Sequence, residues 1–387
     1  MDKCQHQEKE ILNDLNGKGK RVDWKGKKVA SLKLARVYKD ISDKIKNEYK
    51  ERGVHMRYKK VKRAVKNEVG DITGIVLSDE PMGLYDKDGK RVVNYEKRAE
   101  NMRFCGSILD FADMGDKLKL IRSNFCRTPL CVMCQWRKSM RIFFDVSAVM
   151  REVFKRYINC IPVFLTLTVR NCSINKLSET LNVIYNGWNE FMRSKTLNPE
   201  VRGEKRRIVQ GWFRATEITY NDKTDEFHPH FHAVMLLDRS YFKSVDYMRT
   251  EEWVQLWRRS AKLNYDPVCD IRRTRTTKGK QKEVAEIAKY TYKDAEILNK
   301  KLSDDKKSEV VKYLSGALHG RRLYAYGGIM KDIAAELKIQ DIDKTDLVKV
   351  DDDNIDSSLA KMILTYHWNM GISNYTLVKK TERNEKE

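Results

Sequence analysis

The sequence predicts an α+β fold in which a central antiparallel sheet is flanked by helices. Three strand patterns lead to this prediction: an apolar run over 161–169 and two further runs over 209–220 and 231–237. Residues 221–225 favour a turn, so the last two strands are expected to pair as a hairpin. The order strand, helix, hairpin and further helices is typical of an antiparallel sheet with helices packed on it.

The helices are predicted from the spacing of their apolar residues. Such spacing occurs over three segments before the hairpin and two segments after it: 31–51, 138–157, 174–193, 251–263 and 282–298. Apolar residues three or four positions apart share one face of a helix and can pack against a sheet.

Composition limits the classes of protein to which the chain can belong. It has 387 residues, of which 41% are hydrophobic and 10% aromatic, so a folded core needs no disulfides. No apolar run approaches the roughly 18 residues of a membrane span, and no secretory signal opens the chain. We therefore expect a cytoplasmic protein with no membrane partner and with reduced cysteines.

The net charge of +22 favours a polyanionic partner. More than half of this charge lies in residues 17–68, where Trp24 and Tyr58 stand among the cations. We interpret this segment as a nucleic-acid-binding arm, and the alternative is a solvated basic helical face. The DNA contacts expected within the arm are Arg57, Lys59, Lys60, Lys62 and Arg63.

Three of the seven histidines lie within five residues, at His228, His230 and His232. Residues two apart in a strand share a face, so His230 and His232 would present their imidazoles side by side. Imidazole binds divalent transition metals, and Glu217 would approach the pair across the hairpin. We expect the strand to begin after Pro229, which leaves His228 in the turn. The sequence thus predicts a metal site, and the alternative is a set of ordinary polar strand residues.

A second candidate is the predicted helix that contains Glu286 and Tyr290. These residues are four apart and therefore neighbours on one helical face, which Lys293 shares, whereas Tyr292 points away. A phenol is a poor nucleophile at neutral pH unless a metal or an ammonium group stabilises the phenolate. By itself this segment is better explained by a structural tyrosine and a surface glutamate, and only the histidine strand upstream favours a catalytic interpretation.

Four cysteines precede the strands, at Cys105, Cys126, Cys131 and Cys134. Four thiolates can form a tetrahedral structural zinc site. The long first gap and the Cys126–Cys131 spacing leave a second interpretation open, that of buried free thiols.

The order of these motifs resembles that of HUH endonucleases. Residues 164–171, then 230–232, then Glu286 and Tyr290 follow the strand, histidine and tyrosine motifs of that superfamily. The chain looks most like the Rep_1 (pC194/pUB110-like) rolling-circle replication initiators. The resemblance covers roughly residues 100–330 and includes the segments 103–107, 125–137, 270–272 and 320–322 as well as Trp257.

The resemblance implies a role for each site residue. His230, His232 and Glu217 would bind Mg²⁺ or Mn²⁺, and Tyr290 would attack the scissile phosphate. The products would be a 5′-phosphotyrosyl enzyme and a free 3′-OH that primes replication, and Glu286 would activate water for termination. We also expect Arg170, Lys289 and Lys293 to contact DNA.

The resemblance also implies partners and regions. The partners are plasmid double-strand origin DNA with a single-stranded or hairpin nick site, a host helicase of the PcrA type and host replication proteins, with self-association left open. The chain has no phosphate-binding GxxxxGK[ST] loop, which fits a protein that nicks without unwinding. The expected regions are a basic DNA-binding arm (1–95), a cysteine segment (96–140), the HUH core (141–300) and a helical C-terminal region with an acidic stretch (301–387).

Two alternatives to the initiator remain open. One is a non-catalytic DNA-binding regulator that uses the basic arm and a zinc module. The other is a related HUH transposase or relaxase, which would share the chemistry and differ in its DNA target. The acidic stretch over 341–356 is interpreted as a solvated linker, with a contact surface as the alternative.

Overall fold

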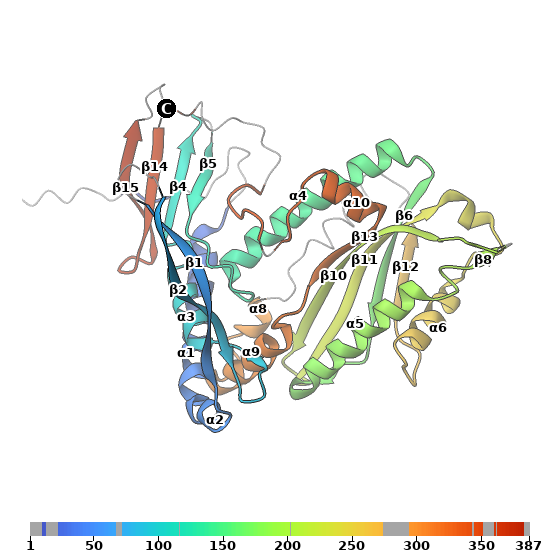
Figure 1. Cartoon of the computed structure of the whole chain (residues 1–387), viewed down its shortest axis with the longest axis horizontal. Helices are drawn as coiled ribbons and strands as arrows, with labels where there is room; N and C mark the ends of the chain where they lie inside the picture. Colours follow the sequence, from blue (N-terminus) through green and yellow to red (C-terminus); the bar gives the residue numbers. More distant parts are fainter. Residues whose placement is uncertain are drawn as a thin grey trace, which may run out of the picture.

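A computed structural model describes residues 10–12, 22–66, 72–115, 117–201, 203–273, 294–342, 344–350, 360 and 362–382. Its largest sheet has the strand order β12-β6-β11-β10-β13, and the short strand β7 also pairs with β11. All of its ladders are antiparallel, as predicted for an α+β fold (Figure 1). The strands are β6 (Cys160–Thr168), β7 (Cys172–Ser173), β10 (Val209–Asn221), β11 (Glu226–Asp238), β12 (Cys269–Arg273) and β13 (Tyr324–Gly328).

Helices cover both faces of this sheet. On one face, α5 (Leu177–Arg193) and α6 (Thr250–Ser260) bury an aromatic core in which Trp188 and Phe231 stack edge to face. On the other face, α4 (Val132–Arg156) and α10 (Ile329–Glu336) pack against side chains such as Phe164 and Phe213. Alternating side chains of the same strands therefore enter two separate cores.

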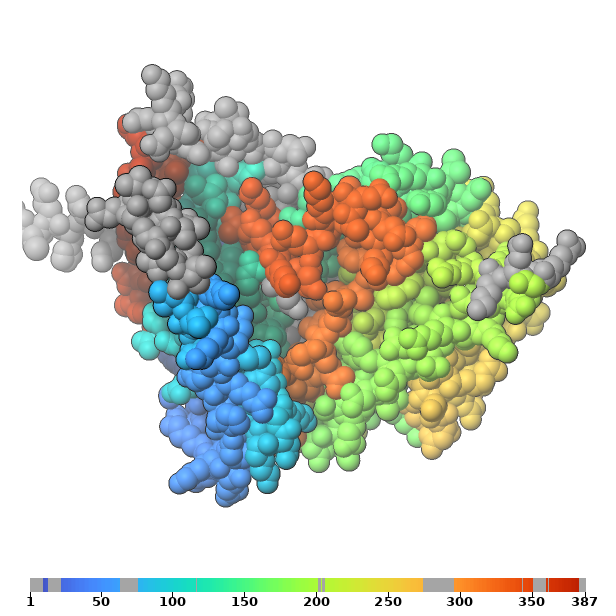
Figure 2. All heavy atoms as spheres, viewed as in Figure 1, coloured from blue at the N-terminus to red at the C-terminus, as the bar shows by residue number. Residues whose placement is uncertain are grey.

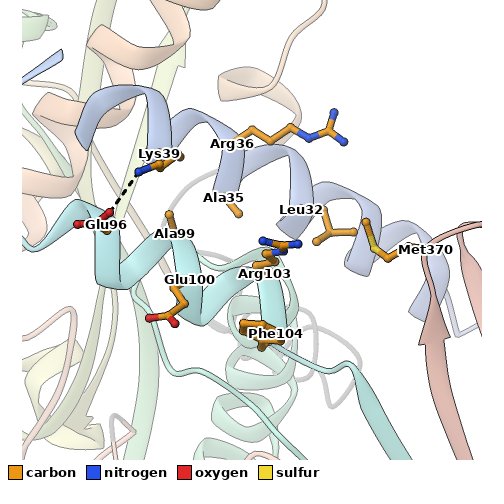
Figure 3. Close-up of a pocket in the computed structure, with 10 residues that line it drawn as sticks. All are labelled: Leu32, Ala35, Arg36, Lys39, Glu96, Ala99, Glu100, Arg103, Phe104 and Met370. Carbon is orange, nitrogen blue, oxygen red and sulfur yellow. Dashed lines mark hydrogen bonds and ion pairs between the residues drawn. The ribbon is translucent and has the colours of Figure 1, made fainter. Parts of the chain in front are cut away.

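A second sheet has the strand order β15-β14-β4-β5. Its strands come from two distant parts of the chain: β4 (Ile108–Asp113), β5 (Leu118–Ser123), β14 (Met362–Asn369) and β15 (Asn374–Glu382). Beside it, α1 (Trp24–Lys44) packs on α3 (Tyr95–Phe104), and Figure 3 shows Ala35 and Ala99 at the crossing of these helices. Small side chains at a crossing allow two helices to approach closely.

A third sheet is a long ribbon formed by β1 (His55–Lys66), β2 (Ile72–Tyr85) and the short β3 (Arg91–Val92), preceded by α2 (Lys46–Glu51). Figure 2 shows this ribbon on the surface of the molecule. The helical-face interpretation is therefore wrong for residues 55–66, which form a strand rich in Lys and Arg. β-branched residues are few in this strand, so its conformation depends on pairing with β2.

Two helices contact both the N-terminal helix α1 and the helices that cover the six-stranded sheet. Helix α4 begins beside the four-stranded sheet and reaches the six-stranded sheet at Val149 and Val153 (Figure 1). Helix α9 (Asp304–Leu318) packs against both α1 and α5, and the Tyr38 hydroxyl donates a hydrogen bond to Ser315 at 2.9 Å.

The acidic stretch also contacts α4. Within the described residues 344–350, Leu347 is 1% exposed and Val350 is 3% exposed. The Arg137 guanidinium donates to the carbonyls of Leu347 at 2.8 Å and Val348 at 2.7 Å, and Arg141 donates to the carbonyl of Lys349. The linker interpretation is therefore wrong for this part, because its backbone carbonyls accept hydrogen bonds from α4 and its apolar side chains Leu347 and Val350 are buried.

Within the described residues, the predicted strands and helices of the six-stranded sheet agree with the structure in type, with two further corrections, whereas the predicted helix over 282–298 lies outside the described residues except for its last part. First, β11 begins at Glu226, so His228 and Pro229 lie in the strand rather than in the turn. On its other side, β11 pairs with β7 at residues 226–227 and with β6 from His230 onward, so the ladder there leaves out His228 and Pro229. The missing N–H of Pro229 therefore costs no ladder hydrogen bond. Second, the region after residue 300 supplies strands β13, β14 and β15 in addition to helices. The expected domain boundaries remain predictions.

The remaining short elements include two 3-10 turns, Ile174–Lys176 and Arg239–Lys243, and the following hairpin and helix. The hairpin of β8 (Glu200–Val201) and β9 (Glu204–Lys205) precedes β10, and α8 (Asp294–Ile297) precedes α9. No helix in the described part of the chain is both long enough and apolar enough to cross a membrane.

Candidate metal centre

The candidate metal centre lies where β10 and β11 pair in the middle of the six-stranded sheet. Glu217 stands directly opposite His230, and Ala215 stands opposite His232. His230 and His232 project from one face, and Phe231 between them is fully buried in the other. The alternation predicted for the histidine strand is confirmed.

The three side chains converge within hydrogen-bonding distance. The Nε2 atom of His232 lies 3.1 Å from Oε2 of Glu217, and Nε2 of His230 lies 3.5 Å from the same oxygen. The two Nε2 atoms are 3.1 Å apart, and each of the three residues is at most 8% exposed. Two imidazole nitrogens and one carboxylate oxygen thus face a common point.

Both imidazoles are oriented through their other nitrogen. The Nδ1 atom of His232 lies 3.1 Å from the Thr166 hydroxyl on β6, and Nδ1 of His230 lies 3.2 Å from the His228 carbonyl. A carbonyl can only accept, so Nδ1 of His230 is the donor and Nε2 carries the lone pair when the ring is neutral. Such contacts hold ligating histidines in place at metal sites.

Burial and hydrogen bonding act in opposite directions on Glu217. Burial raises the pKa of the carboxyl, but the contacts of Glu217 with His230 and His232 outweigh burial and hold the pKa well below its usual range. Glu217 is therefore ionised at neutral pH. The pKa of the third histidine, His228, is lowered by burial and by its neighbour His230, so His228 stays neutral beside the centre.

The donor set fits a divalent cation. The ligand atoms of Glu217, His230 and His232 lie within 4.8 Å of one another. Carboxylate suits Mg²⁺ and Mn²⁺, and imidazole suits transition metals, so the donor set is compatible with the expected Mg²⁺ or Mn²⁺. Three protein ligands also leave coordination positions for water or substrate, as catalytic sites do.

Strand β6 contributes a residue that sequence analysis did not single out. Thr166 was part of an apolar strand pattern, but its register opposite His232 makes it a contact of the metal centre. The available signal was the alternation of Thr166 and Thr168 with leucines, which places both hydroxyls on the histidine face. Phe164 follows on the same face and stacks on His232 with ring centroids 5.5 Å apart.

The predicted nucleophile lies outside the described residues. This holds for Tyr290 and Glu286 and for the expected DNA contacts Lys289 and Lys293. Their roles remain predictions from the sequence. The described chain resumes at α8, where the Glu296 carboxylate accepts a hydrogen bond from the Tyr220 backbone at 2.9 Å on β10.

The other expected DNA contacts lie on two surfaces. Arg57, Lys59, Lys60 and Lys62 are exposed on β1, and Arg63 continues the same strand. Arg57 also stacks on the Tyr85 ring at 4.6 Å, and Lys59 pairs with Glu80 at 3.4 Å. Arg170 is exposed just after β6, and its guanidinium lies over the Tyr265 ring at 4.0 Å.

The structure also brings Cys105, Cys126, Cys131 and Cys134 together, far from the histidines in the sequence. A groove of about 760 Å³ opens nearby between α1 and α3. Figure 3 shows that Leu32, Arg103, Phe104 and Met370 line one part of it. It shares no residue with the metal centre.

Comparison with known proteins identifies the family. The Rep_1 family, described as replication protein, matches residues 117–376. The chain belongs to the Rep_1 family of replication proteins. It is 31% identical over 385 residues to a "Protein rep" of Bacillus amyloliquefaciens, covering 95% of this chain and 97% of that protein.

Two further relatives support the same assignment. A "Protein rep" of a Bacillus species is 35% identical over 274 residues, covering 66% of this chain and 86% of that protein. A "Protein rep" of Streptococcus pneumoniae serotype 2 is 29% identical over 384 residues, covering 98% and 99% of the two chains. No solved structure matches the chain. The Rep_1 match includes Glu217, His230 and His232 and three of the four clustered cysteines.

Proposed function

We propose that this member of the Rep_1 family initiates plasmid rolling-circle replication by nicking and rejoining origin DNA at an HUH-type site. The observation that carries the proposal is the convergence of Glu217, His230 and His232 on one face of the sheet. The family membership supports a replication role, and the net charge of +22 supports a DNA partner.

In this proposal the three residues hold Mg²⁺ or Mn²⁺, which would polarise the scissile phosphodiester and neutralise developing charge. The contribution of the protein is orientation. The Thr166 hydroxyl and the His228 carbonyl fix both imidazole rings, and the ionised Glu217 completes the donor set.

The Tyr290 oxygen would attack the scissile phosphorus, and the bond from phosphorus to the 3′ oxygen would break. Tyr290 would lose its phenolic proton, and the leaving 3′ oxygen would gain a proton to become the primer 3′-OH. The phosphotyrosine bond conserves the energy of the broken phosphodiester, so rejoining needs no ATP. Glu286 would later take a proton from the water that attacks the terminating linkage.

DNA would be bound by two sets of cations. Strand β1 carries exposed lysines and arginines and forms a two-stranded ribbon with β2. A β-ribbon has a suitable width for the major groove of DNA. Arg170 lies at the end of β6, just past the Thr168 that pairs with His230, and would contact the strand near the nick. A host helicase of the PcrA type and host replication proteins would act on the nicked product.

The test uses the full-length protein with a labelled single-stranded origin oligonucleotide and Mn²⁺. Wild type and Tyr292→Phe are expected to form a covalent adduct, and Tyr290→Phe is expected to form none. Tyr292→Phe is the matched control because it removes the same hydroxyl two residues away. Mass spectrometry of the tryptic adduct identifies the attached residue.

The same assay separates the competing functions. Adduct formation by Tyr290→Phe at the wild-type level contradicts the assignment of the nucleophile. Tight origin binding without any adduct in the wild type supports the non-catalytic regulator instead. An adduct that forms on a transposon end or a transfer origin and not on the plasmid double-strand origin supports a transposase or relaxase.

A further inference from the structure

The cysteine cluster is assembled from three separate elements. Cys105 follows α3, Cys126 lies between β5 and α4, Cys131 is the N-cap of α4, and Cys134 lies in its first turn. All four sulfurs lie within 4.8 Å of one another, and no disulfide joins them. Sγ of Cys134 is 3.4 Å from Sγ of Cys105 and 3.7 Å from Sγ of Cys126. A zinc tetrahedron with bonds of about 2.3 Å places its sulfurs about 3.8 Å apart.

Backbone N–H groups point at the sulfurs. The amide of Cys126 donates to Sγ of Cys105 at 3.4 Å, and the amide of Arg127 donates to Sγ of Cys134 at 3.2 Å. The amide of Thr128 donates to Sγ of Cys126 at 3.5 Å. Arg127 adopts a left-handed conformation with φ 55°, which turns successive amides toward the cluster. Thiol sulfur is a weak acceptor and thiolate a strong one, so this arrangement suits thiolates.

Helix α1 adds a buried cation beside the cluster. The side chain of Lys28 is 0% exposed, and its ammonium donates to the carbonyls of Cys105 at 2.7 Å and Arg103 at 2.8 Å. Among the described residues, Lys28 makes no ion pair with a carboxylate. A buried ammonium is costly unless negative charge lies close to it. Four zinc-bound thiolates carry a net charge of −2 and would supply that charge.

Ser31, one turn further along α1, contacts the cluster as well. Its hydroxyl lies 3.5 Å from Sγ of Cys131 and accepts a hydrogen bond from the Met133 amide at 3.0 Å. The hydroxyl proton is therefore available to the sulfur. Lys28 and Ser31 together are positioned as outer contacts of a four-sulfur centre.

We propose that Cys105, Cys126, Cys131 and Cys134 bind one structural Zn²⁺, with Lys28 and Ser31 as its outer contacts. All four coordination positions are filled by protein, so the site is closed to substrate. It is separate from the Glu217–His230–His232 centre and does not depend on the proposed nicking activity. Zinc binding releases the thiol protons to solvent.

The location of the site gives it a structural purpose. It joins the end of α3, the connection after β5 and the start of α4, and α1 packs against it. Helix α4 continues to the six-stranded sheet (Figure 1). If zinc holds the start of α4 in place, it also holds α1 and α3 in position relative to that sheet. Loss of zinc should therefore destabilise the whole chain rather than one loop.

The first experiment measures metal in the purified full-length protein. After dialysis against a weak chelator, the wild type is expected to retain about one zinc per chain. The variant His230→Ala/His232→Ala is expected to retain the same amount, and Cys131→Ser and Cys134→Ser are expected to lose it. The control variants Cys160→Ser and Cys269→Ser change half-buried cysteines outside the cluster and should keep zinc.

A second measurement does not depend on the folding of a cysteine variant. Replacement of zinc by Co²⁺ in the wild type should produce thiolate-to-cobalt absorption and the visible bands of tetrahedral cobalt. Lys28→Met should keep these bands while weakening metal affinity about 10- to 100-fold, as loss of an outer contact does. Folded wild type without zinc, zinc lost only in the histidine variant, or cobalt bands without thiolate character would each overturn the proposal.

Discussion

The Thr166 hydroxyl lies 3.1 Å from Nδ1 of His232, and the two residues face each other across the β6–β11 ladder. One strand therefore carries the ligand and its neighbour orients it. His230 is instead oriented from within its own strand, where the His228 carbonyl lies 3.2 Å from Nδ1 of His230. A side-chain contact can be removed by substitution whereas a backbone contact cannot, so Thr166 gives direct experimental access to the metal centre.

The first prediction concerns Thr166→Val, which keeps the shape of the side chain and removes the hydroxyl. Affinity for Mn²⁺, measured by titration calorimetry, is expected to fall about 10- to 100-fold. The control is Thr168→Val, because the Thr168 hydroxyl donates to the Val268 carbonyl and not to a ligand. Equal Mn²⁺ affinities for wild type and Thr166→Val would show that the hydroxyl does not orient His232.

The second prediction concerns the exposed ribbon. Lys60→Ala/Lys62→Ala should weaken DNA binding and lower the slope of log affinity against log salt by up to about 1.8, because each phosphate contact contributes about 0.9. The control is Lys195→Ala/Lys243→Ala, which removes two exposed lysines that follow α5 and β11 and lie outside the ribbon. Fluorescence anisotropy at several salt concentrations gives the slope. An unchanged slope in the β1 variant would exclude the ribbon as a phosphate-binding surface.

The third prediction concerns pH and His319, the residue that follows α9. Burial lowers the pKa of His319 to about 4, helped by the nearby Arg98 and Arg91. The usual value is 6.5, so between pH 6.5 and 4 the unfolded chain binds a proton that the folded chain excludes. This residue therefore decreases stability as pH falls through that window and has no such effect above pH 6.5.

Thermal unfolding at several pH values tests the effect of His319. The loss of melting temperature from pH 6.5 to pH 4 should be smaller in His319→Gln than in wild type. His367→Gln, which changes an exposed histidine on β14, serves as the comparison. If the His319→Gln curve stays parallel to that of wild type, this histidine does not contribute to acid destabilisation.

The fourth prediction concerns residues 344–350 on α4. Leu347→Ala removes a side chain that is 1% exposed and should lower the free energy of unfolding by about 2–5 kcal/mol. Leu337→Ala, at a site that is 39% exposed, should change it by no more than about 0.5 kcal/mol. Urea unfolding measures both. Similar values for the two variants would mean that this segment is not held on α4.

Much of the candidate metal centre could be predicted from the sequence because its chemistry is local. His230 and His232 are two residues apart, and the two-residue period of a strand places them on one face whatever surrounds them. Glu217 lies on the adjoining strand of a hairpin with a short turn, and the turn determines which residues stand opposite each other. The α+β class follows from the same short-range patterns.

Other features were decided only by packing between distant segments. The sequence left a four-cysteine site and separate free thiols as alternatives, and only the structure shows that Cys105 meets Cys134 and that Lys28 is buried beside them from another helix. Thr166 became a contact of His232 only through the pairing of β6 with β11, and the backbone carbonyl of Leu347 accepts a hydrogen bond from Arg137 on α4. Residue spacing determines which face of an element a side chain occupies, whereas long-range burial and register decide which element that face meets.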